Sequence, residues 1–214
     1  HWLQEGFATY YSLLAERELY GEDYFYNLLF RNATLLKDAA KKDTIPIYSE
    51  KASSLTYYQK GAWALFYLKE HIGEKTFDKI VKKYLKKYQY KNVETNDFLE
   101  IVKQYSNFDV EDFKKRWLED YHYPEKDIND LLLKNEMAAT LIKLQKDAKT
   151  PYDIRYNELL KLMQSSVFYT VKIKILSQIK NIEFDKKEAI LKAAMQSQNI
   201  KVRQSVAQNL DKIP

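Results

Sequence analysis

The sequence has no cysteine and very little glycine or proline. The absence of cysteine excludes a disulfide scaffold and a thiolate metal site. Four glycines and four prolines in 214 residues are too few for a β-sandwich or barrel, which needs a turn about every 8–12 residues. No apolar run approaches the length of about 18 residues that a membrane-spanning helix requires. These absences favour a protein built from long helices, and they leave its localisation open.

The composition is that of a globular protein. Hydrophobic residues make up 45% and charged residues 30%, with a formal net charge of +5, which excludes a disordered tail. Residues 69–91 carry eight lysines and three acidic residues, a surplus as large as that of the whole chain. The apolar residues Ile80, Val81, Tyr84, Leu85 and Tyr88 alternate with these lysines, so we expect a helix with a buried stripe and a solvated basic face. We predict no nucleic-acid binding, although a nucleic-acid-binding helix would look similar.

Hydrophobic periodicity predicts helices through the first 124 residues. They are expected over 1–20, 22–41 and 57–71, with glycines ending the first and third and an irregular loop over 42–56. Three further helices are expected to start after caps at Thr76, Thr95 and Asp109, the last with Asp112 in a capping box. Pro124 closes this part of the sequence.

After Pro124 aromatic residues become scarce, and short helices follow one another in pairs. Two stretches, 159–182 and 190–213, match at a shift of 31 residues. The matched positions are Val171 with Val202, Lys172 with Arg203, Ile175 with Val206, Leu176 with Ala207, Ile179 with Leu210, and Ile182 with Ile213. Such self-similarity favours stacked helix pairs of the HEAT or armadillo type. The alternative is two ordinary helical hairpins that match because they share helical periodicity.

Two stretches carry chemistry. The first is HWLQEGFATYY, residues 1–11. Its Trp-Leu-x-Glu-Gly-Phe-Ala pattern resembles the second motif of the zinc aminopeptidases of the aminopeptidase N family, which are gluzincin metallopeptidases. In that family two histidines of an H-E-x-x-H motif bind zinc, and a glutamate further along the chain is the third ligand. The resemblance places that ligand on Glu5. Taken alone, Glu5 would pass for an ordinary acidic residue in a first helical turn.

The second stretch is LTYYQKGAWAL, residues 55–65, which resembles the Tyr-x-Lys-Gly-Ala segment of the same family. The alignment places the family's catalytic tyrosine on Tyr58, whose phenol would donate a hydrogen bond to the oxyanion of the tetrahedral intermediate. Tyr57 is the competing candidate, and only the Lys60-Gly61 register excludes it. We expect Gly61 to permit a close approach by another segment.

The resemblance implies a fold and a division into domains. We expect an all-α chain. Residues 1–124 would be the C-terminal helical part of a gluzincin catalytic domain, and residues 125–214 a HEAT-like helical domain that we expect to be truncated in this sequence. No H-E-x-x-H is present, because the three histidines are His1, His71 and His122. We therefore expect the chain to be a fragment that is inactive alone and binds no zinc. We expect His1 to be structural and His71 to cap a helix C-terminus.

The implied function is the removal of N-terminal residues from peptides by a zinc-dependent enzyme. The implied partners are peptide substrates and upstream domains of the same chain. Two alternatives remain open: a non-catalytic scaffold that has lost the zinc site, and a helical-repeat module that binds a peptide or protein.

Overall fold

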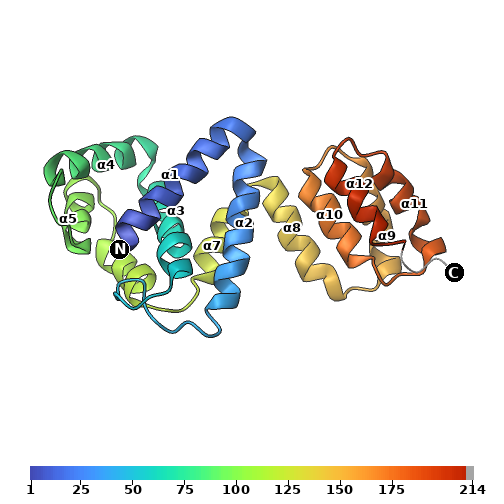
Figure 1. Ribbon diagram of the computed structural model, residues 1–214, viewed down its shortest axis with the longest axis horizontal. Helices are drawn as coiled ribbons and strands as arrows, with labels where there is room; N and C mark the ends of the chain where they lie inside the picture. Colours follow the sequence, from blue (N-terminus) through green and yellow to red (C-terminus); the bar gives the residue numbers. More distant parts are fainter. Residues whose placement is uncertain (211–214) are drawn as a thin grey trace. The chain divides into compact units, whose positions relative to one another are not determined.

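The computed structural model describes residues 1–210, and these residues form helices and connecting loops without a strand (Figure 1). The predicted all-α class is therefore confirmed. The chain divides into two compact units, the first covering His1–Leu132 and the second starting at Leu133. The helix that follows Pro124 thus belongs to the first unit.

The first unit holds seven α-helices and two π-helical segments among the described residues. In chain order they are α1 (Trp2–Tyr20), α2 (Glu22–Ala39), η1 (Thr56–Lys60), α3 (Gly61–Ile72), α4 (Glu74–Tyr88), α5 (Thr95–Tyr105), α6 (Val110–Phe113), η2 (Lys114–Glu119) and α7 (Glu125–Leu132).

Helix α3 is the centre of the first unit. Its first nine residues, 61–69, are all buried, because α1, α4 and α7 pack around it. Trp63, Leu65 and Leu68 are at most 1% exposed, and each buried side chain of this size contributes about 1.5–3 kcal/mol to folding. The element that carries the second sequence motif is therefore held in the core.

Several helix boundaries differ from the predicted ones. Gly21 and Gly73 end α1 and α3 with positive φ, as expected of glycine. Helix α4 already starts at Glu74, so Thr76 is not its cap. Helix α5 is capped by Glu94 in a capping box rather than by Thr95, its first residue. The predicted cap at Asp109 is confirmed, because its carboxylate accepts the backbone N–H of Asp112.

Helix α4 has the predicted amphipathic form. Phe77, Ile80 and Val81 are buried, while the lysines from Lys75 to Lys87 are exposed. Leu85, expected in the buried stripe, is 61% exposed instead. The basic side of this helix is a solvated face, as expected.

The helix predicted over 57–71 is two different helices. Residues 56–60 form the π-helical turn η1, and only from Gly61 does the α-helix begin. In a π-helical turn each backbone hydrogen bond spans five residues instead of four, and hydrophobic periodicity does not reveal this difference. Such turns occur often at functional sites.

The second unit consists of short helices. They are α8 (Glu136–Lys146), η3 (Asp147–Lys149), α9 (Tyr152–Gln164), α10 (Tyr169–Gln178), α11 (Phe184–Met195) and α12 (Ile200–Ala207). Helix α10 packs against α8 and α12, α9 packs against α11, and the consecutive helices α9 with α10 and α11 with α12 also pack together. This alternation places neighbouring pairs in two layers within the unit.

The sequence repeat coincides with α10 and α12 only in part. Val171 and Val202 are both fully buried, and Ile175 and Val206 are both at most 2% exposed. Ile179, by contrast, is buried whereas its counterpart Leu210 is 39% exposed. The last matched position, Ile213, lies outside the described residues. The HEAT-like assignment thus remains a prediction.

None of the helices described for this chain combines the length and the apolar composition needed to cross a membrane.

Candidate functional site

Glu5 lies in the first turn of α1 and is partly exposed. The start of this helix is anchored by Trp2, whose indole Nε1 donates a buried hydrogen bond of 2.9 Å to Oγ1 of Thr95 at the start of α5. Within the helix, the Glu5 carbonyl accepts the Thr9 hydroxyl at 2.8 Å. The carboxylate therefore projects from a helix end that is fixed in the core.

Helix α1 crosses the start of α3 at two glycines. A Cβ atom added to Gly6 would lie 2.9 Å from the carbonyl carbon of Gly61, and one added to Gly61 would lie 3.0 Å from Cα of Gly6. Only glycine at both positions lets the two backbones touch in this way. The close approach expected at Gly61 is thus confirmed, and its partner is the residue that follows Glu5.

This crossing brings Glu5 and Tyr58 together although they lie 53 positions apart in sequence. The Tyr58 hydroxyl lies close to the Glu5 carboxylate, and hydrogen bonding to that carboxylate together with its negative charge raises the pKa of the Tyr58 phenol. Tyr58 is 43% exposed, so its hydroxyl remains open to solvent.

The neighbouring Tyr57 points elsewhere. Its hydroxyl donates a hydrogen bond of 2.6 Å to the carbonyl oxygen of Ser49, and its ring lies 5.7 Å from that of His1. In the sequence, only the position of the Lys60-Gly61 pair distinguished Tyr58 from Tyr57. In the structure the two tyrosines have different partners, and Tyr58 is the one beside Glu5.

The first residue of the π-helical turn is held by Asp43. The Asp43 carboxylate accepts the hydroxyls of Thr56 at 2.8 Å and Ser53 at 2.7 Å. Partial burial raises the pKa of Asp43, but these hydrogen bonds outweigh burial and the pKa lies below its usual value. Asp43 thus stays ionised and fixes the start of η1.

The last residue of the turn, Lys60, is only 4% exposed. Its ammonium donates to the backbone carbonyls of Asp120 at 2.6 Å and His122 at 3.4 Å, just after η2. Burial lowers the pKa of Lys60 to about 8, against the opposing charges of Asp120 and Asp43. In the sequence, Lys60 served only to align the Tyr-x-Lys-Gly-Ala motif, and its burial was not predicted.

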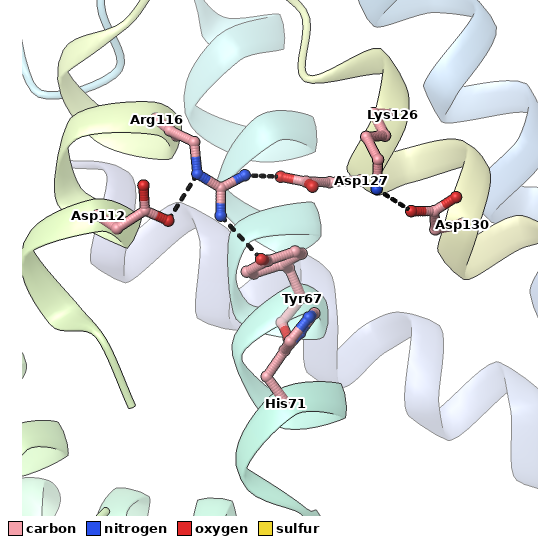
Figure 2. A network of polar contacts seen from close by, with 7 residues as sticks. All are labelled: Tyr67, His71, Asp112, Arg116, Lys126, Asp127 and Asp130. Carbon is pink, nitrogen blue, oxygen red and sulfur yellow. Dashed lines mark hydrogen bonds and ion pairs between the residues drawn. The ribbon is translucent and has the colours of Figure 1, made fainter. Parts of the chain in front are cut away.

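A polar network lies beside the second half of α3 (Figure 2). The guanidinium of Arg116 in η2 contacts Asp127 of α7, Asp112 at 2.7 Å and the Tyr67 hydroxyl at 2.9 Å. His71 Nδ1 lies 2.7 Å from the Tyr67 carbonyl, one turn earlier in α3, and the cap of this helix is Gly73. The network joins α3, η2 and α7.

A groove of about 920 Å³ runs beside α1. Trp2, Phe7, Tyr11, Tyr57 and Tyr84 give it an aromatic lining. Glu5 and Tyr58 are not part of that lining, but Gln4 and Tyr57, their neighbours in sequence, are.

Glu5 is the one predicted metal ligand in the chain, and a carboxylate oxygen is a suitable donor for zinc. Among residues 1–210 no group of three His, Cys, Asp or Glu side chains could hold a metal ion. Two of the histidines lie in other settings: His71 is in the network at the end of α3, and His122 pairs with Asp120 at 2.6 Å. The donor chemistry fits zinc, but the described residues supply only part of a ligand set.

Sequence comparison agrees with the geometry. Residues 1–117, more than half of the chain, match the family model described as "Peptidase family M1 domain". Endoplasmic reticulum aminopeptidase 2 of Homo sapiens is 36% identical over 107 residues, which cover 45% of this chain and 11% of that protein. Glutamyl aminopeptidase of Sus scrofa is 30% identical over 142 residues, covering 61% and 15%. No solved structure matches the chain significantly.

The matched residues 1–117 include both the Trp-Leu-x-Glu-Gly helix and the Tyr-x-Lys-Gly turn. The chain belongs to peptidase family M1. Because the relatives named above are matched over only 11–15% of their length, the chain corresponds to a small part of each.

Sequence reasoning missed three features of this site: the π-helical turn, the hydrogen bonds of Asp43 and the burial of Lys60. One signal was available for Lys60, because it directly precedes the apolar run from Gly61 to Leu68. The local sequence gives no signal for the π-helical form of the turn or for the hydrogen bonds between Asp43 and the hydroxyls of Ser53 and Thr56.

Proposed function

We propose that this chain is part of a zinc-dependent aminopeptidase that removes N-terminal residues from peptides. The observation that carries the proposal is the contact between Glu5 and Tyr58 at the Gly6–Gly61 crossing. These are the two residues to which the family resemblance assigns chemistry, and packing alone does not require a carboxylate and an open phenol there.

In this proposal Glu5 is the third zinc ligand and two histidines from outside this sequence complete the set. When bound, zinc polarises the scissile carbonyl and activates a water molecule. Tyr58 donates its phenolic proton in a hydrogen bond to the oxygen that becomes negatively charged as water attacks. That charge exists only in the transition state and the intermediate, so the donor accelerates the reaction rather than merely binding substrate.

The 214-residue chain alone is expected to be inactive and to bind no zinc tightly. One carboxylate does not fix a zinc ion, because affinity depends on the number and geometry of ligands. Calorimetry of the chain with micromolar zinc measures this directly, and one tight zinc per chain would contradict it.

The test of the function uses the full-length protein that carries this chain. Glu5→Gln keeps the size of the side chain and removes the charge, so zinc content and aminopeptidase activity should both fall. Glu18→Gln, an exposed change on the same helix, is the matched control and should change neither. Full zinc content and activity in Glu5→Gln would favour the alternative, a scaffold without catalysis.

A peptide- or protein-binding role for the second unit is the other candidate. The layered packing of α8, α10 and α12 against α9 and α11 favours it, since stacked helix pairs present extended surfaces. Retention of a partner by the full-length protein, lost when exposed residues of these helices are changed, would support this role.

A further inference from the structure

We propose that Lys60 is a positioning residue for Tyr58, acting by clamping the π-helical turn that carries the phenol. This inference rests on the proposed function, in which Tyr58 stabilises the oxyanion. Lys60 itself touches no reacting atom.

Both ends of the turn η1 are buried and hydrogen-bonded, whereas Tyr58 at its middle is exposed. At its start, Thr56 is 7% exposed and bonded to Asp43. At its end, Lys60 is 4% exposed and bonded to the carbonyls of Asp120 and His122. Tyr58, two residues from each of these anchors, is 43% exposed. The position of its hydroxyl is therefore set by the ends of the turn.

The anchor of Lys60 is itself a rigid structure. The Asp120 carboxylate accepts a hydrogen bond from the backbone N–H of His122 at 2.9 Å. The same carboxylate contacts Nδ1 of the His122 ring at 2.6 Å. This closes residues 120–122 into a compact turn whose carbonyls point at the Lys60 ammonium. The helix before it, η2, contains Trp117 and Leu118, which are fully buried. Lys60 thus ties the Tyr58 turn to a fixed part of the core.

Burying an ammonium here is costly, and packing does not require it. Two carbonyls and two carboxylates at longer range do not fully offset the loss of hydration, which the lowered pKa of Lys60 also reflects. A methionine of similar length would fill the same space without a charge. The charged donor is therefore explained by the directional hold it gives on the turn.

Helix α3, which follows η1, offers a matched control. Lys69 is 8% exposed and lies nine residues further along the chain, where it pairs with Glu70 at 3.8 Å and Glu74 at 3.5 Å. It is a buried lysine of α3 that makes no contact with η1. If Lys60 only stabilised the fold as a buried lysine, Lys60→Met and Lys69→Met would have the same effect on kcat.

The first measurement is a double-mutant cycle of kcat and KM in the full-length protein. Lys60→Met should lower kcat about tenfold with KM nearly unchanged, because a misplaced donor weakens only the transition state. In a Tyr58→Phe background the same change should lower kcat less than about twofold, since the group that Lys60 positions is gone. Lys69→Met should leave kcat unchanged, and Lys60→Arg, which keeps the donors, should lose less than Lys60→Met. Equal losses of kcat in both backgrounds would overturn the proposal.

The second measurement does not depend on activity. A single 3-fluorotyrosine at position 58 of the same protein reports its surroundings through its fluorine chemical shift. Lys60→Met should shift or broaden this signal, whereas Lys69→Met should not, and an unchanged signal in Lys60→Met would overturn the proposal. If Lys60→Met does not fold, Lys60→Arg gives both tests at smaller amplitude. An inactive wild-type protein would refute the proposed function alone, because the fluorine signal still tests the clamp.

Discussion

Gly6 of α1 and Gly61 at the start of α3 are in direct backbone contact, and neither leaves room for a Cβ atom. Gly6 directly follows Glu5, and Gly61 lies three residues after Tyr58. The distance between the Glu5 and Tyr58 side chains is therefore set by a contact between two residues that have no side chain.

Gly61→Ala tests this crossing. The added Cβ would lie 3.0 Å from Gly6 Cα and 3.1 Å from the Trp2 carbonyl oxygen, so the helices must separate. We expect a loss of about 1–3 kcal/mol in the free energy of unfolding, measured by urea denaturation of the chain. Gly73→Ala is the control: its φ of +81° is strained for alanine, but nothing lies within 4 Å of an added Cβ.

The two variants are told apart by the site. Gly61→Ala should move the fluorine signal of a 3-fluorotyrosine at position 58, whereas Gly73→Ala, destabilising through backbone strain alone, should leave it in place. A Gly61→Ala protein of unchanged stability and unchanged Tyr58 signal would show that the crossing does not set the site.

Lys60 gives the stability of the chain a specific pH dependence. Its pKa is about 8 when folded and about 10.5 when unfolded. Between these values the unfolded state binds more protons, so the free energy of unfolding should rise with pH, by roughly 2 kcal/mol from pH 8 to pH 10. Above pH 10 buried tyrosines oppose this, because burial raises the pKa of Tyr26 to about 12 and its stabilising effect is lost as the phenol ionises.

The measurement is a series of urea denaturation curves from pH 7 to pH 10. Lys60→Met should remove most of the rise, because Lys60 has the most strongly lowered lysine pKa among the described residues, whereas burial lowers that of Lys172 less. A stability that falls over this range in the wild-type chain, or a rise of undiminished size in Lys60→Met, would contradict the assignment.

Arg116 and Lys126 make ion pairs of different value in the network of Figure 2. The side chain of Asp127, bound by Arg116, is 14% exposed, while both partners of the Lys126–Asp130 pair are well exposed. Arg116→Met should cost about 1–2 kcal/mol in the free energy of unfolding, since it leaves Asp127 without its main partner. Lys126→Met should leave stability unchanged within error. If thermal denaturation shows the same loss of stability for Arg116→Met and Lys126→Met, the burial of Asp127 does not strengthen its ion pair with Arg116.

Much of the fold could be predicted from the sequence. The amphipathic patterns and the glycines at 21 and 73 gave the helix order, because these signals are local. The cap of α5 was misplaced by one residue, since Glu94 and Thr95 are both able to cap and only the geometry selects between them. Leu85 was expected in the core but is exposed, because periodicity cannot tell where a neighbouring element stops covering a helix.

The candidate site could be predicted only as far as its motifs reach. Glu5 and Tyr58 were identified by resemblance; Glu5 lies on the predicted helix, whereas Tyr58 lies on a π-helical turn where an ordinary helix was predicted. What joins them could not be predicted, because the Gly6–Gly61 contact and the hold of Lys60 on residues 120–122 link segments far apart in sequence. The chemical roles of Glu5 and Tyr58 remain predictions.

The central claim is that Tyr58, and not its neighbour Tyr57, serves the reaction of the full-length protein. The most direct measurement compares kcat of Tyr58→Phe and Tyr57→Phe on a peptide substrate. Loss of an oxyanion donor should lower kcat of Tyr58→Phe by about 10²–10³, while Tyr57→Phe, which loses only its bond to Ser49, should stay within a few-fold of the wild type. Full activity in Tyr58→Phe, or the larger loss in Tyr57→Phe, would contradict the account.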